Sequence, residues 1–136
     1  MVRIPLAKTD IGLDEVAAVS QVMESGRLAF GPELEQFERD FAVYHGVPGA
    51  DMINSGTSAL MISLLALGVG AGDEVIMPAL TFVGTVNAIL ATGATPVLVD
   101  VNAETANISI TSLKQAITER TKAFIPVHLY LSLIHI

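Results

Sequence analysis

The fold of this protein is decided by one short polar stretch, Asn54-Ser55-Gly56-Thr57-Ser58-Ala59-Leu60. The segment Asp51-Met52-Ile53 comes before it and predicts a short strand, and a helical apolar pattern covers 57–67. A strand, a small polar turn and a long apolar helix, in this order, begin a crossover between parallel strands. The stretch therefore predicts an α/β sheet in which a helix starts where a strand ends.

The same alternation of strands and helices continues along the chain. The pattern predicts strands at 74–77, 97–99 and 123–127, and helices at 81–92 and 111–118. Strands rich in β-branched residues, and a helix that is apolar nearly all round, are typical of a sheet covered on both faces. We therefore expect a mainly parallel sheet with flanking helices.

Two amphipathic helices are predicted ahead of this sheet. Apolar residues at helical spacing place the first at 13–25, with Gly26 as its C-terminal stop. The second begins at Pro32, because proline is favoured at the first helical position, and it ends at Gly46. Together they predict a helical N-terminal arm.

The expected domain boundary lies where the arm gives way to the alternating pattern. We expect the arm to cover 1–48 and part of an α/β domain to cover 49–130. The apolar tail 131–136 is expected to be an artefact, such as the product of a frame shift. A genuine alternative terminus is the other interpretation of the tail.

Composition excludes several classes of protein. Of the 136 residues, 51% are hydrophobic and 15% are charged, which is enough apolar surface to fold a core and exclude disorder. Seven Lys and Arg against fourteen Asp and Glu leave a net charge of −7, which argues against nucleic-acid binding. The chain has no cysteine, and His135 has no second ligand at a suitable spacing, so no metal site is expected. No apolar run is long enough to span a membrane and no signal peptide is recognised, so we expect a cytoplasmic protein.

Residues at the start of the helix in the opening stretch suggest a ligand site. Free N–H groups and the positive end of the helix dipole attract an anion there. Gly56 would let the backbone approach a ligand closely, and Thr57 and Ser58 can add hydroxyl donors. The alternative is that this segment is an ordinary hydroxyl N-cap.

A second stretch, 77–83, should lie at the same edge of the sheet. Ligands of parallel sheets bind beyond the carboxyl ends of the strands, and Phe82 there could stack on a planar ring. The alternative is a core position for Phe82. The glycine-rich segment 68–72 follows a helix and precedes a strand, which is the wrong order for a dinucleotide-binding loop.

Several motifs, in order and spacing, closely resemble the DegT/StrS family of nucleotide-sugar aminotransferases. They are 31–38 (GPELEQFE), 54–60 (NSGTSAL), 67–76 (LGVGAGDEVI), 78–83 (PALTFV), 93–101 (GATPVLVDV) and 126–130 (PVHLY). The resemblance covers about residues 3 to 130.

The resemblance implies the N-terminal part of the large domain of a fold-type-I transferase that depends on pyridoxal 5′-phosphate (PLP). Carried over by position, Gly56, Thr57 and Ser58 would hold the cofactor phosphate, and Phe82 would stack on the pyridine ring. The family implies a homodimer that moves an amino group from glutamate or glutamine to a nucleotide-linked keto-sugar. Such reactions serve the biosynthesis of cell-surface polysaccharides or secondary-metabolite sugars.

The catalytic residues of that family find no match in this sequence. The chemistry needs a lysine that forms a Schiff base with the cofactor and an acid opposite the pyridine nitrogen. Both lie downstream of the matched motifs in the family, and Lys8, Lys114 and Lys122 stand elsewhere. Asp100 and His128 match a structural strand-end acid and a loop residue, so we assign neither a catalytic role.

Two rival functions stay open at this point. A PLP-dependent sugar dehydratase of the same family has a histidine in place of the lysine. A non-catalytic fragment that binds a phosphate or a partner is the other. We expect the 136-residue chain alone to be inactive, as one part of a sugar aminotransferase.

Overall fold

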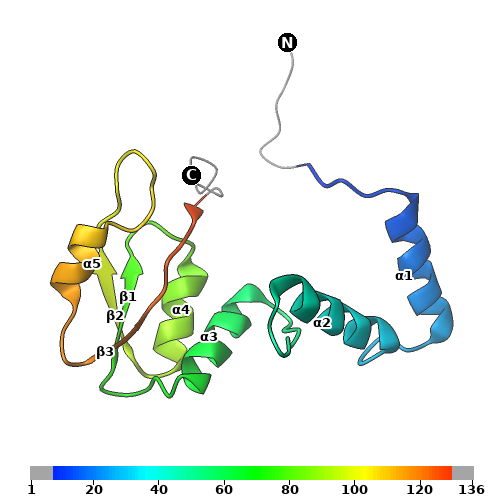
Figure 1. Cartoon of the computed structure of the whole chain (residues 1–136), viewed down its shortest axis with the longest axis horizontal. Coiled ribbons are helices and arrows are strands. Elements are labelled where there is room, and N and C mark those ends of the chain that lie inside the picture. The colour runs from blue at the N-terminus through cyan, green and yellow to red at the C-terminus, as the bar shows by residue number, and fades with distance from the viewer. Residues whose placement is uncertain (1–7, 130–136) are drawn as a thin grey trace, which may run out of the picture. The chain divides into compact units, whose positions relative to one another are not determined.

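The computed structural model describes residues 8–129, and within them five helices and three strands (Figure 1). In chain order these are α1 (Leu13–Ser25), α2 (Pro32–His45), α3 (Gly56–Ala66), β1 (Glu74–Pro78), α4 (Val83–Ala91), β2 (Thr95–Val99), α5 (Ile110–Ala116) and β3 (Thr121–Phe124). The chain divides into two compact units, one ending at Met52 and one beginning at Ile53. The predicted tail 131–136 lies outside the described residues.

The second unit is an α/β layer built on a parallel three-stranded sheet. The strand order is β2-β1-β3, and β1 pairs in parallel with both neighbours. All five residues of β1 are buried, as expected for the central strand of a parallel sheet. The core beneath it consists of buried Leu64, Val69, Val75, Met77, Ile89, Ala94 and Ile125. The expected mainly parallel sheet with flanking helices is confirmed.

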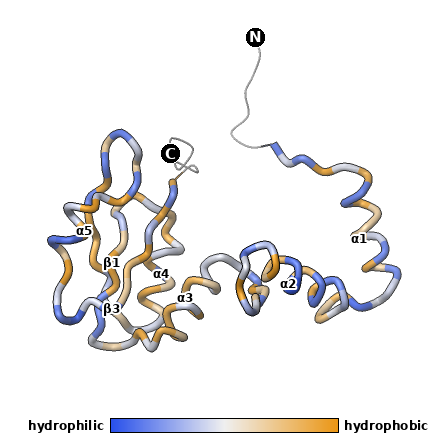
Figure 2. The backbone as a smooth tube through the Cα atoms, viewed as in Figure 1, coloured by the Kyte–Doolittle hydropathy of each residue, from blue (hydrophilic) through white to orange (hydrophobic). Residues whose placement is uncertain are grey.

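The expectation of a strand just before α3 is wrong. No strand forms at 51–53 in the described chain; the Met52 N–H instead donates to Glu38 Oε1 at 2.8 Å. A strand needs backbone partners for its hydrogen bonds, and the Met52 N–H is satisfied by this carboxylate instead. Helix α3 is apolar nearly all round, as expected; it packs mainly against α4 and leaves Ile62 and Leu65 exposed. Figure 2 shows both of these helices coloured as predominantly apolar.

The first unit consists of the two predicted amphipathic helices. Helix α1 has the predicted bounds, and Gly26 ends it in the left-handed conformation with a φ of 68°. Gly46 ends α2 in the same way. At the start of α1 the Gly12 N–H donates to Glu15 Oε2 at 2.7 Å, and this hydrogen bond lowers the pKa of the Glu15 carboxyl.

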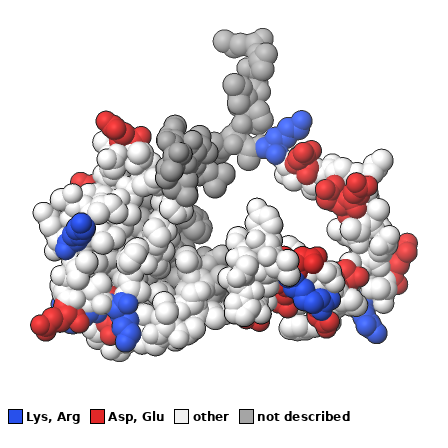
Figure 3. Space-filling view, viewed as in Figure 1, with Lys and Arg blue, Asp and Glu red and all other residues white. Residues whose placement is uncertain are grey.

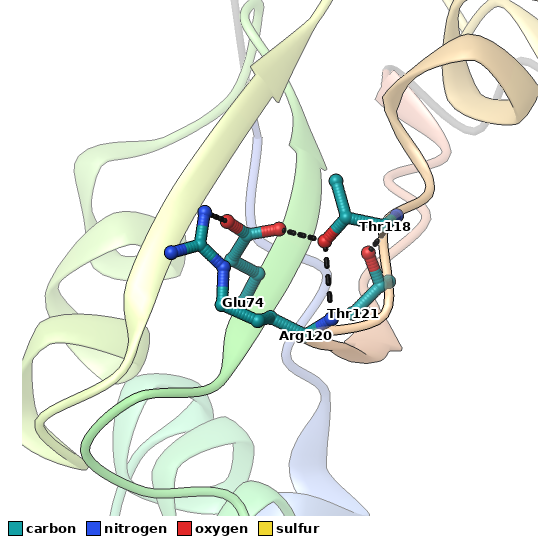
Figure 4. Close-up of polar contacts among 4 residues, drawn as sticks. All are labelled: Glu74, Thr118, Arg120 and Thr121. Carbon is teal, nitrogen blue, oxygen red and sulfur yellow. Dashed lines mark hydrogen bonds and ion pairs between the residues drawn. The ribbon is translucent and has the colours of Figure 1, made fainter.

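A buried carboxylate fastens β3 to the amino end of β1 (Figure 4). Glu74 is 7% exposed, and its two oxygens contact Arg120 Nη2 at 2.5 Å and the Thr118 hydroxyl at 2.6 Å. The Glu74 N–H also donates to the Arg120 carbonyl at 2.8 Å. The pairing register shifts directly after Glu74, so this cluster holds β3 at the point where its ladder is irregular.

Removing Arg120 should therefore cost more stability than neutralising Glu74. We expect Arg120→Met to lower the free energy of unfolding by about 2–3 kcal/mol, because it leaves a buried carboxylate without its cation. Glu74→Gln removes the buried charge itself and should cost only about 1 kcal/mol. Urea denaturation followed by circular dichroism measures both. Arg39→Met is the matched control, since its 3.7 Å contact with Glu35 is exposed on both sides. The interpretation fails if Glu74→Gln is the more damaging change.

Candidate functional site

The predicted anion site lies at the N-terminus of α3. Ser55, in an extended conformation, is the N-cap, and its Oγ accepts a hydrogen bond from the Ser58 N–H at 3.1 Å. The Ser55 hydroxyl donates to Ser58 Oγ at 2.9 Å, which leaves the Ser58 proton free to point elsewhere. The hydroxyl cap proposed as the alternative is thus present, but Ser55 forms it. The hydroxyls of Thr57 and Ser58 are not needed for capping.

The space in front of this helix end is open. The N–H groups of Gly56 and Thr57 begin the helix and have no acceptor among the described residues. No acidic side chain stands in the first turn to neutralise the positive helix end. A Cβ at Gly56 would meet nothing within 4 Å, so neither packing nor backbone conformation demands glycine there. A ligand that approaches the backbone closely is a reason for glycine at this position.

Phe82 lies at the start of α4, just beyond the carboxyl end of β1. It occupies the N-cap position and makes no side-chain capping bond. Its side chain is 74% exposed, so the alternative of a core position is wrong. An aromatic ring this exposed is available to stack on a ligand.

Gly84, which sequence reasoning missed, brings the two predicted stretches together. A Cβ at this buried glycine would lie 2.5 Å from Thr57 Oγ1 and 2.8 Å from Phe82 Cε1. The Thr57 hydroxyl and the Phe82 ring therefore both lie against the first turn of α4. A signal was present in the sequence. Glycine inside a helix lowers its stability, so a glycine within the predicted helix 81–92 indicates that another group approaches the backbone closely there.

The remaining residues considered in the sequence lie outside α3 and α4. Asp100 follows β2 and its Oδ1 accepts a hydrogen bond from the Val101 N–H at 2.8 Å. His128 is exposed in the segment after β3. Lys122 is exposed on β3 opposite the amino end of β1, and Lys114 lies in the last turn of α5.

Other kinds of site find little support in the described residues. These residues hold no group of three or more His, Cys, Asp or Glu side chains placed to bind a metal ion. None of the described helices is both long and apolar enough to cross a membrane. On the face that Figure 3 shows, the basic side chains stand singly among acidic ones.

The fold is that of PLP-dependent aminotransferases. NtdA of Bacillus subtilis, solved with bound cofactor PMP, is 45% identical with a TM-score of 0.81, over 88% of this chain and 28% of NtdA. Spr1654 of Streptococcus pneumoniae, solved in a PLP form, is 39% identical with a TM-score of 0.87, over 98% of this chain and 36% of Spr1654. The chain therefore spans about a third of the length of such transferases.

Comparison of the sequence with protein families gives a narrower assignment than the fold does. Residues 9–133 match the DegT/DnrJ/EryC1/StrS aminotransferase family, and the chain belongs to that family. The spore coat polysaccharide biosynthesis protein SpsC of Bacillus subtilis (strain 168) is 46% identical over 125 residues. That match covers 92% of this chain and 32% of SpsC, so the chain spans about a third of the length of this relative.

Proposed function

We propose that the full-length protein is a PLP-dependent sugar aminotransferase, which moves an amino group from glutamate or glutamine to a nucleotide-linked keto-sugar. The observation that carries this proposal is the meeting of the open α3 N-terminus with the exposed Phe82 ring at Gly84. A phosphate and a planar ring at these two places are the two ends of a pyridoxal phosphate molecule.

The chain's own residues would divide the work of holding the cofactor. The free N–H groups at Gly56 and Thr57, with the hydroxyls of Thr57 and Ser58, would donate to the phosphate. Phe82 would stack on the pyridine ring and limit its tilt. When bound, PLP supplies the electron sink for amino-group transfer, and the protein supplies its position.

Membership of the family supports the coarse activity, and the name of SpsC favours a role in polysaccharide biosynthesis. We propose a cytoplasmic homodimer as the working form. The dehydratase alternative differs at the residue that bonds the cofactor. In the family, that position lies downstream of the motifs that match here.

Binding of pyridoxamine 5′-phosphate (PMP) to the 136-residue chain tests the site without requiring a lysine. We expect PMP to bind more tightly than pyridoxamine, which lacks the phosphate, and Phe82→Ala to weaken PMP about tenfold by removing the stacking surface. Isothermal titration calorimetry measures both. Phe30→Ala is the matched control, since Phe30 is 91% exposed but lies in the other unit. Equal affinity for PMP and pyridoxamine would exclude a phosphate site in this chain.

A further inference from the structure

The start of α4 breaks a local rule of helix capping. N-cap positions favour Ser, Thr, Asp or Asn, because a side-chain oxygen there accepts a bond from a free N–H. Phe82 fills the position and supplies no such oxygen. A local rule broken in an otherwise regular element is typical of a functional position. Something other than a cap must then hold this turn in place.

Two threonines on either side of Phe82 supply the missing support. Thr81 Oγ1 and Thr85 Oγ1 lie 3.0 Å apart, and the Thr85 N–H donates to the Phe82 carbonyl at 3.0 Å. Both bonds end on Thr85, which is only 5% exposed and is flanked along the helix by buried Gly84 and Ala88. The exposed Phe82 thus sits in a turn that is tied to the core through one buried residue.

The Phe82 ring also lies against the first turn of α4. Its Cδ1 and Cε1 atoms lie 2.9 and 2.8 Å from the point where a Cβ of Gly84 would stand, and Thr57 Oγ1 lies 2.5 Å from that point. The direction of the Phe82 side chain relative to Thr57 therefore depends on the conformation of this one turn. A buried hydroxyl also needs its partner, so the threonine pair is not free to rearrange at little cost.

We propose that Thr81 and Thr85 are positioning residues, whose hydroxyl pair holds the Phe82 ring beside Thr57. In this role the pair acts through Phe82. The expected effect of the pair on ligand affinity rests on the proposed function. The expected effect on the mobility of Phe82 rests on the geometry alone.

Fluorescence anisotropy decay tests the mobility directly. The sequence contains no tryptophan, so Phe82→Trp places a single reporter at this position. In that background Thr85→Val keeps the β-branched shape and removes the hydroxyl, and Thr85→Ser keeps the hydroxyl. We expect Thr85→Val to at least double the fast, local component of the decay, and Thr85→Ser to stay near the parent.

Thr92→Val is the matched control on the same helix. The Thr92 hydroxyl donates to the Ile89 carbonyl at 2.8 Å at the far end of α4, so its loss should affect stability but not the reporter. Thr81→Val, at a half-buried position, repeats the test if Thr85→Val does not fold. Both changes together should have no more effect than either alone, because they remove one shared bond.

PMP affinity, measured with Phe82 in place, supplies the second readout. We expect Thr85→Val to weaken PMP by less than the roughly tenfold loss in Phe82→Ala, because it loosens the stacking ring without removing it. Thr85→Ser should restore most of the affinity. An unchanged anisotropy decay in Thr85→Val and Thr81→Val, or an equal change in Thr92→Val, would overturn the inference. Should the parent chain not prefer PMP over pyridoxamine, the proposed function fails, while the anisotropy result still decides the role of the threonines.

Discussion

Incubated with PLP, glutamate and a nucleotide-linked keto-sugar, the purified 136-residue chain is expected to form no 2-oxoglutarate above the background of the free cofactor. Amino transfer requires a lysine amine that bonds the cofactor and carries protons between the reacting atoms. Of the lysines in the chain, Lys122 lies on β3 opposite the amino end of β1. The proposed site lies beyond the carboxyl end of β1. Lys114 lies in the last turn of α5, and Lys8 lies in the first unit.

A coupled assay for 2-oxoglutarate measures this expectation. The positive control is a chain extended to the length of its relatives, assayed under the same conditions. Turnover by the short chain that is abolished by Lys114→Met or Lys122→Met would contradict the placement of the site. Turnover by the extended chain only would support it, and the identity of its amino donor and sugar would define the substrate class.

Replacing Thr57 by Val together with Ser58 by Ala is expected to weaken PMP binding by at least about 100-fold. Two hydrogen bonds to a doubly charged phosphate would be lost, each worth roughly 1.5–3 kcal/mol. The Ser55 cap does not depend on either hydroxyl, because it accepts from the Ser58 backbone N–H. The helix should therefore fold normally, as circular dichroism would show.

Gly56→Val tests the same site by a different physical effect. The space beside Gly56 is open in the structure, so the side chain should fit without strain and yet block the approach of the phosphate. We expect a loss of PMP affinity with an unchanged thermal midpoint of unfolding. A thermal midpoint that falls while the affinity stays at the parent value would contradict this account.

The start of α5 offers a matched control for both experiments. Ser109 caps that helix in the same way, accepting from the Ser112 N–H at 3.2 Å, and the hydroxyls of Ser109 and Ser112 also contact. Thr111→Val with Ser112→Ala therefore removes the same groups from a similar cap. An equal loss of PMP affinity in this control would mean that the effect of the α3 variant is not specific to the site.

The helices and the central strand could be predicted because short windows of sequence specify them. Helix α1 occupies the predicted range, since its apolar spacing and Gly26 are both local signals. β1 extends the predicted 74–77 by one residue, because its apolar run is continuous. The start of α3 could be located to within one residue from its small polar turn.

The failures concern relations between segments. The segment 51–53 forms no ladder, because the Met52 N–H donates to the Glu38 carboxylate, a partner fourteen residues away that the local pattern could not indicate. The end of β3 was placed three residues too late, and its start two too late, because the Glu74 cluster and the register shift set that pairing. Hydrophobicity alone could not indicate that Phe82 is exposed while Thr85, three residues later, is buried.

The sequence by itself thus determined the element types, the parallel crossover pattern, the family and the residues of the two candidate stretches. Only the tertiary structure decided that Thr57 and Phe82 meet at Gly84, that Ser55 rather than Thr57 or Ser58 caps α3, and that the hydroxyls of Thr81 and Thr85 pair. The physical reason is the range of the interactions. Capping and periodicity act within one or two helical turns, whereas a contact between two helix starts depends on how α3 and α4 pack.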